Sequence, residues 1–142
     1  MKNFAKKLEY DGQMDAECID LCNAMNSLPG IITMESCCGH SCSPYHIFFR
    51  VTNSKEGLFF LTRCVDHRYW KYGYLWKIHL LVGDSVHEDG ELPITYLLTS
   101  DPIVGEDAYL QAKDLLDNMI YHLNHRNFIK LYNLNLNNFS WK

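Results

Sequence analysis

Basic residues are scarce in this chain, which carries 13 lysines and arginines against 17 aspartates and glutamates. The resulting net charge of −4 argues against a general binder of duplex DNA or of anionic membranes, because both depend on surplus positive charge. Long apolar runs are also absent, and stretches such as 47–49 are far too short to span a bilayer. The first residues lack the apolar centre of a secretory signal peptide. We therefore expect a cytoplasmic protein that does not enter membranes.

Disulfides are not expected, although six cysteines are present. The chain of 142 residues is long enough to bury a core without covalent staples, and a reducing cytosol keeps thiols free. The same length predicts a single domain over 1–142. The cysteines are Cys18, Cys22, Cys37, Cys38, Cys42 and Cys64.

Hydrophobic periodicity predicts an α+β fold. Apolar residues recur at helical spacing in three segments, and β-branched or aromatic residues cluster in four short ones. The order helix-strand-strand, helix-strand-strand, helix predicts duplicated units that form a mainly antiparallel sheet, with helices packed on one face. The tail 128–142 has regularly placed apolar residues and is predicted to pack on the body or on a partner subunit. The predicted helices cover 14–28, a segment from Asn53 or Ser54 to near Trp70, and 106–125; the strands cover 31–34, 45–51, 75–82 and 94–99, with a loop at 35–44 and a chain break at Asp101-Pro102.

The predicted loop at 35–44 holds the densest group of reactive side chains. Structural zinc commonly needs two separated ligand pairs, and the second pair is missing because Cys18 and Cys22 belong to an apolar helical stripe. We therefore predict no metal and no cofactor. A nucleophilic cysteine would need one defined base, and the sequence selects none of several histidines, so no catalytic residue is assigned. Small residues around a glycine instead favour close backbone approach to an anion, which makes ligand-binding candidates of Glu35, Ser36, Cys37, Cys38, Gly39 and His40.

A second candidate segment, 63–77, interleaves aromatic and basic side chains. The chain has four arginines, and three of them fall in or near predicted element ends that could adjoin the cysteine-rich loop. A planar guanidinium suits phosphate or carboxylate, and flat rings beside cations suit a nucleobase. Aromatic residues here are equally typical of packing between helix and sheet, and both interpretations stay open. The candidates are Arg50, Arg63, His67, Arg68, Tyr69, Trp70 and Trp76.

The stretch Cys18 to Val51 carries two resemblances. Its central Glu35-Ser36-Cys37-Cys38-Gly39-His40, followed by a proline and an aromatic strand, resembles small uncharacterised bacteriophage-type proteins. The helix, strand, turn and strand are also similar to the tRNA wybutosine-synthesis methyltransferase family, whose turn reads Ser-Ser-Cys-Ser-Gly-Arg. Ser36, Cys37 and Gly39 match that turn, while Glu35, Cys38 and His40 stand at its first serine, last serine and arginine.

The first resemblance implies a phage protein that acts in the host cytoplasm against host defence. Together with the two candidate segments, it predicts a non-catalytic protein that binds a small anionic nucleotide-like ligand, such as a host immune signalling nucleotide. Small binding proteins commonly place pockets at subunit interfaces, and the apolar residues of the tail favour a homo-oligomer. The second resemblance implies an enzyme that modifies RNA or a nucleotide. A third hypothesis is an inhibitor that binds a host protein through its aromatic surface or its tail.

Overall fold

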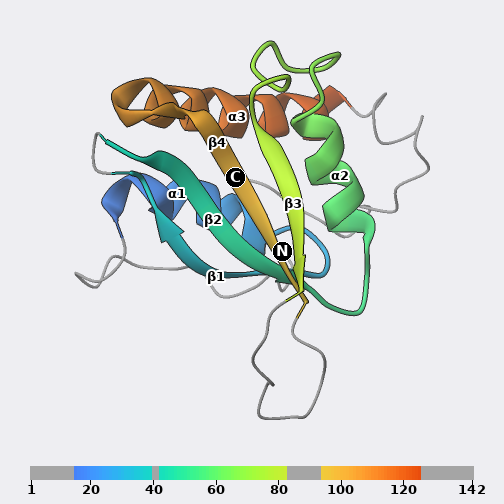
Figure 1. Cartoon of the computed structure of the whole chain (residues 1–142). Helices are drawn as coiled ribbons and strands as arrows, with labels where there is room; N and C mark the ends of the chain where they lie inside the picture. Colours follow the sequence, from blue (N-terminus) through green and yellow to red (C-terminus); the bar gives the residue numbers. More distant parts are fainter. Residues whose placement is uncertain (1–14, 40–41, 83–93, 126–142) are drawn as a thin grey trace.

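The computed structural model describes residues 15–39, 42–82 and 94–125, which form three helices and one four-stranded antiparallel sheet. The predicted α+β class with repeated helix-strand-strand units is confirmed (Figure 1). The elements are α1 (Ala16–Asn26), β1 (Ile31–Cys37), β2 (Pro44–Val51), α2 (Glu56–Cys64), β3 (Lys77–Val82), β4 (Ile94–Val104) and α3 (Gly105–His125).

Each helix-strand-strand unit contributes one hairpin to the sheet. The spatial order is β1-β2-β4-β3, so the two hairpins join through β2 and β4, and β1 and β3 are the edge strands. The register of the central pair places Ile47 opposite Leu98 and Phe49 opposite Tyr96. Because side chains alternate along a strand, these four residues share one face of the sheet.

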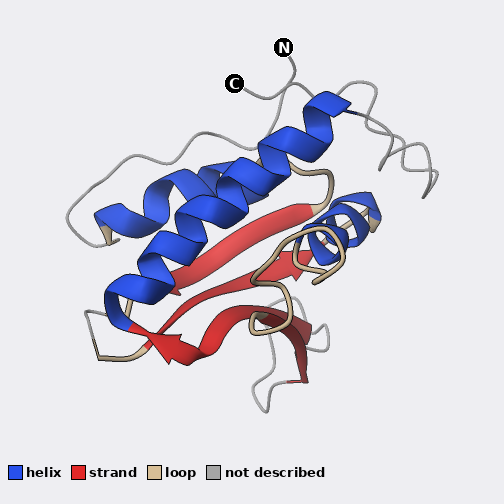
Figure 2. Ribbon diagram, turned by 90° about the horizontal axis from the view of Figure 1, so that it is seen from above, coloured by secondary structure: helices blue, strands red, loops and turns tan. Residues whose placement is uncertain are grey.

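All three helices lie on that same face of the sheet (Figure 2), as predicted. The predicted apolar stripes of the first and third helices are buried against it, with Cys18, Leu21 and Met25 from α1 and Leu115 and Met119 from α3 almost fully enclosed. Cysteines 18 and 22 therefore act as small core residues, which is the role that their helical spacing predicts.

The prediction of a loop over 35–44 is wrong at its start, because Glu35, Ser36 and Cys37 belong to β1. A register shift after Thr33 places Glu35 opposite Phe48 and Ser36 opposite Ile47. Pairing with a central strand thus extends β1 through residues such as Glu35, whose intrinsic preference for strands is low.

The predicted end of the second helix near Trp70 is also wrong, since α2 ends at Cys64. The carboxylate of Asp66 accepts a hydrogen bond from the backbone N–H of Arg68 at 2.9 Å. This side-chain bond favours a turn over a further helical turn.

Asp101-Pro102 does not break the chain as predicted, because β4 continues through it to Val104. The bond is a cis peptide, and Pro44 at the start of β2 pairs with Val104 at the end of β4.

The predicted tail 128–142 lies outside the described residues. Among the helices that the structure describes, none combines the length and the apolar composition needed to cross a bilayer.

Candidate functional site

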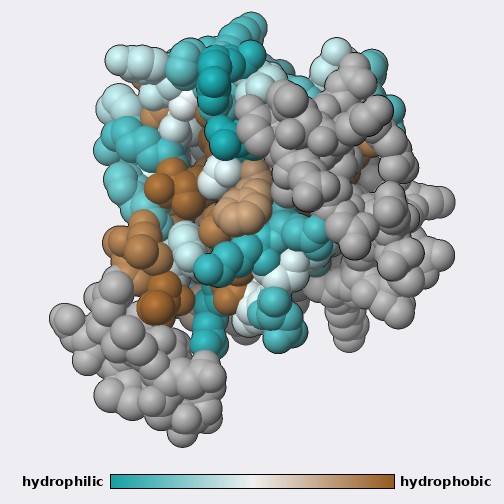
Figure 3. All heavy atoms as spheres, turned by 90° about the vertical axis from the view of Figure 1, so that its right-hand side faces the viewer, coloured by the Kyte–Doolittle hydropathy of each residue, from teal (hydrophilic) through white to brown (hydrophobic). Residues whose placement is uncertain are grey.

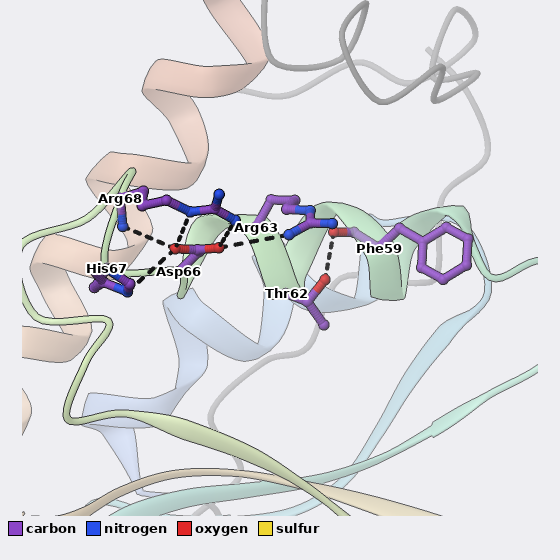
Figure 4. A network of polar contacts seen from close by, with 6 residues as sticks. All are labelled: Phe59, Thr62, Arg63, Asp66, His67 and Arg68. Carbon is purple, nitrogen blue, oxygen red and sulfur yellow. Dashed lines mark hydrogen bonds and ion pairs between the residues drawn. The ribbon is translucent and has the colours of Figure 1, made fainter.

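Three of the predicted basic residues gather around one acidic side chain just beyond α2. Asp66 receives the guanidinium of Arg68 at 2.8 Å (Nη2 to Oδ2) and 3.2 Å (Nε to Oδ1). Arg63 Nη1 lies 3.6 Å from Oδ2 of the same carboxylate, and His67 Nδ1 lies 3.6 Å from Oδ1 (Figure 4). We call Arg63, Asp66, His67 and Arg68 the arginine cluster. Among these four residues, two guanidinium groups accompany one carboxylate.

The backbone turn that follows α2 builds the arginine cluster. The carbonyl of Asp66 accepts hydrogen bonds from the N–H groups of Tyr69 and Trp70 at 2.9 and 3.0 Å. Hydrogen bonds from Arg68 hold the pKa of the Asp66 carboxyl well below its usual range, so the carboxylate stays ionised at neutral pH. A fixed anion therefore sets the plane of the Arg68 guanidinium, although the side chain of Arg68 is 58% exposed.

Aromatic rings adjoin the arginine cluster, but they differ in exposure. Tyr74 is 80% exposed, and its ring meets the His67 ring edge to face at a centroid distance of 6.1 Å. Tyr69 is half-buried, with the Arg68 guanidinium carbon 5.9 Å from its ring centroid. Trp70 and Trp76 are buried in the core at 6% and 3% exposure, and Trp76 Nε1 donates to Gln111 Oε1 at 2.7 Å. The exposed ring surface beside the cations thus comes from tyrosine rather than from tryptophan.

The cysteine-rich segment belongs to a different part of the molecule. The buried Cys38 donates its backbone N–H to Asp15 Oδ2 at 2.9 Å. Gly39 adopts a φ of +89°, a conformation suited to glycine, and Ser43 accepts a hydrogen bond from the N–H of Gly105 at the start of α3. His40 lies outside the described residues.

The two predicted halves of the binding site do not line one pocket. The carbonyl of Ser43 meets α3 at Gly105, whereas the carbonyl of Cys64 accepts a hydrogen bond from Asn118 Nδ2. These two positions are 13 residues apart on one helix, or roughly 20 Å at about 1.5 Å per residue. The structure therefore brings Arg63, His67 and Arg68 together without bringing Gly39 to them.

Arg50 and Glu35 occupy a third position, on the sheet face opposite the helices. Arg50 follows the buried Phe49 in β2, and Glu35 pairs with Phe48, so both belong to the alternate set of side chains. Ser36 pairs with Ile47 and belongs to the helix-facing set, where its hydroxyl is buried. Of the predicted candidates, those in 63–69 lie together at one site, and this site includes the exposed side chain of Arg68.

Two residues of this site were not among the predicted candidates. Asp66 organises the two arginines, and Tyr74 supplies the exposed ring. The signal for Asp66 is present in the sequence as an acidic residue placed between basic residues at spacings of three and two, which permits both ion pairs and a side-chain turn.

Three buried thiols are poor candidates for chemistry. Burial raises the pKa of Cys18 to about 12, and it also raises the pKa of Cys22 and of Cys64. The thiolate is the reactive form, so these groups remain protonated and inert at neutral pH. In the part of the chain that is described, no group of three or more Cys, His, Asp or Glu side chains could hold a metal ion.

Thiol labelling of the native protein is expected to follow exposure. A mild alkylating reagent at neutral pH should modify the exposed Cys42 first, and Cys18, Cys22 and Cys64 only after denaturant is added. Peptide mass mapping over time measures this order. Labelling of Cys18 in native buffer as fast as Cys42 would contradict the burial of α1 against the sheet.

No family model, no curated protein and no solved structure matches this chain.

Proposed function

We propose that this protein binds a small anionic, nucleotide-like ligand at the arginine cluster and releases it unchanged. One observation carries the proposal: Arg63, His67 and Arg68 converge on a single carboxylate, beside a tyrosine that is 80% exposed. The planar guanidinium groups suit a phosphate group, and the ring of Tyr74 suits a nucleobase.

The ion pairs with Asp66 favour ligand binding in a second way. An exposed arginine normally loses side-chain freedom when it binds an anion, at a cost of about 0.5–1.5 kcal/mol for each ordered side chain. The two hydrogen bonds from Arg68 to Asp66 already restrict that guanidinium before a ligand arrives. The side chain of Arg68 therefore loses less conformational freedom when a ligand binds.

Storage of a nucleotide without turnover accounts better for these features than catalysis does. Three thiols are buried with raised pKa values, and the cysteine-rich segment lies at the opposite part of α3 from the arginine cluster. We accordingly favour a sponge for a signalling nucleotide, in keeping with the resemblance to phage-type proteins and a place in the host cytoplasm. We further propose that the protein is a homo-oligomer.

Replacing both arginines with glutamine is expected to weaken nucleotide binding by at least about tenfold, because two charge-assisted contacts are lost. Isothermal titration calorimetry with a panel of linear and cyclic nucleotides compares the wild type with the variant carrying R63Q and R68Q. Binding by the wild type should also weaken as salt is added, since the cluster is exposed.

Arg50→Gln provides a control for the loss of an arginine, because it removes one guanidinium group from the opposite face of the sheet. The control is expected to bind as the wild type does. Mass spectrometry of the recovered nucleotide distinguishes storage from turnover, and an altered ligand would favour the enzyme hypothesis. If the wild type retains no nucleotide, or if R50Q alone abolishes binding, the proposed site is wrong.

A further inference from the structure

Within residues 15–39, 42–82 and 94–125, the β3 edge of the sheet is unpaired and carries exposed apolar side chains. β4 pairs with one side of β3, and no other described strand pairs with its second side. Leu80 is 60% exposed although it pairs with Tyr96 and so belongs to the face that the helices cover. Leu81 on the other face is 38% exposed, and Phe59 of the neighbouring α2 is 50% exposed. Figure 3, which faces the side formed by α2 and β3, shows apolar side chains gathered there. We call Leu80 and Leu81 the edge patch.

The edge strand β3 lacks the devices that normally prevent a sheet from extending. Natural edge strands carry bulges, prolines or well-placed charges that discourage pairing with another chain. β3 runs in continuous register with β4 over Lys77–Val82, contains no proline, and has its single charged residue at its first position. Its backbone is therefore suited to accept a further strand.

The opposite edge provides the comparison. β1 also exposes apolar residues, with Ile32 at 48% and Met34 at 45%. It is interrupted, however, by a register shift between Thr33 and Glu35, and the exposed carboxylate of Glu35 lies in the middle of the strand. These features make β1 the protected edge and β3 the one prepared for pairing.

We infer that β3 pairs with β3 of a second copy of this chain, antiparallel about a two-fold axis, to form a continuous eight-stranded sheet. An antiparallel pair of identical strands is self-complementary, so one patch serves both subunits. Centring the axis on Leu80 places Leu80 opposite its counterpart and His79 opposite Leu81. The two Lys77 side chains then lie at opposite ends of the pair, roughly 20 Å apart at about 3.4 Å per residue, beyond the range of strong repulsion.

The alternative register centred on His79 is less favourable. It would place the two imidazoles opposite each other and bring each Lys77 opposite an apolar Leu81, so that the charge of Lys77 would lie within the paired segment rather than at its end. The ion pair of Lys77 with Asp101, at 3.8 Å, is kept at the rim in the register centred on Leu80. The position of Lys77 thus favours the register centred on Leu80.

This inference gives the proposed homo-oligomer its surface and does not depend on ligand binding. Sedimentation velocity across a concentration series is expected to show a reversible monomer–dimer equilibrium in the micromolar range, because the pairing surface is small. Leu80→Lys should raise the dimer dissociation constant by about tenfold or more, since it opposes two charges at the axis. Hydrogen exchange adds a direct measurement: amides in 77–82 should exchange more slowly at high than at low protein concentration, and this difference should vanish in L80K.

Leu110→Lys is the matched control, because Leu110 is 49% exposed on α3, outside the edge patch. It is expected to dimerise as the wild type does. Ile32→Lys tests the other edge, and loss of the dimer in I32K but not in L80K would overturn the inference. A wild type that remains monomeric at every concentration would overturn it as well. Nucleotide binding by L80K is expected to be normal, so failure of this inference and failure of the proposed ligand site are distinguishable.

Discussion

Truncating Phe49 to alanine is expected to lower the free energy of unfolding by about 3–5 kcal/mol. Phe49 is fully buried in the central strand β2, and its ring stacks on Tyr96 of β4 at a centroid distance of 5.4 Å. The substitution removes both the buried apolar surface and this ring contact, and it leaves a cavity where the two hairpins join. Urea unfolding followed by circular dichroism measures the change. A loss of this size is a large share of the roughly 5–15 kcal/mol that stabilises a typical domain.

Phe49→Leu separates the two contributions, because it keeps most of the apolar volume and removes the ring stacking. Its effect is expected to be well below that of alanine, at about 1–2 kcal/mol. The exposed Phe59 supplies a second comparison, since Phe59→Ala leaves no buried cavity and should change the stability of the monomer by less than about 1 kcal/mol. If F49A were no more destabilising than F59A, the junction of β2 with β4 would not be the centre of the core.

The fold class could be predicted because the buried positions of a helix or a strand recur at the spacing characteristic of that element. Cys18, Leu21 and Met25 recur at helical spacing since one face of α1 must meet the sheet, and the buried positions confirm this. The limits of elements were less predictable where distant contacts decide them. Ser36 lies in a strand because Ile47 is opposite it, and neither residue alone indicates that pairing.

The candidate site was predictable only in its local part. Arg63 and Arg68 lie five residues apart, so a turn between them suffices to bring their charges together, as Asp66 does. The distance between this cluster and Gly39 depends instead on where two separate segments meet α3, at Gly105 and at Asn118. The residues of either segment do not indicate where on α3 that segment will pack. The expectation of one shared pocket therefore had no residue pattern to support it.

The aromatic residues in 69–76 also differ in a way that the sequence does not reveal, because some are buried and one is exposed. Three consecutive turns around Gly73 place Trp70 and Trp76 inward and Tyr74 outward. Trp70 and Trp76 meet edge to face at 5.7 Å within the core, whereas Tyr74 meets His67 at the surface. The sequence made candidates of Trp70 and Trp76 and not of Tyr74, because composition alone does not reveal which rings the backbone turns toward solvent.

Replacing Gly73 with alanine is expected to lower stability by about 1–3 kcal/mol and to weaken nucleotide binding at the arginine cluster by at least about tenfold. A Cβ atom at this position would overlap the carbonyl oxygen of Val65 and would come within 2.6 Å of the Asp66 carbonyl carbon and the His67 amide nitrogen. All of these are backbone atoms, which cannot move aside by a simple rotation. The turn that presents Asp66 must therefore shift, and the guanidinium of Arg68 shifts with it because it is bonded to that carboxylate.

Phe49→Leu is the appropriate control for Gly73→Ala, because it weakens the core by a similar amount and leaves the turn at 65–73 untouched. Both variants are compared by calorimetric titration at a temperature where circular dichroism shows each to be folded. F49L is expected to bind nucleotide with wild-type affinity, whereas G73A is expected to lose at least about tenfold, as does the variant with R63Q and R68Q. Equal binding by folded G73A and wild type would mean that the turn does not position the arginines. Recognition would then depend on their charge alone, because net charge is unchanged in G73A and only the geometry differs.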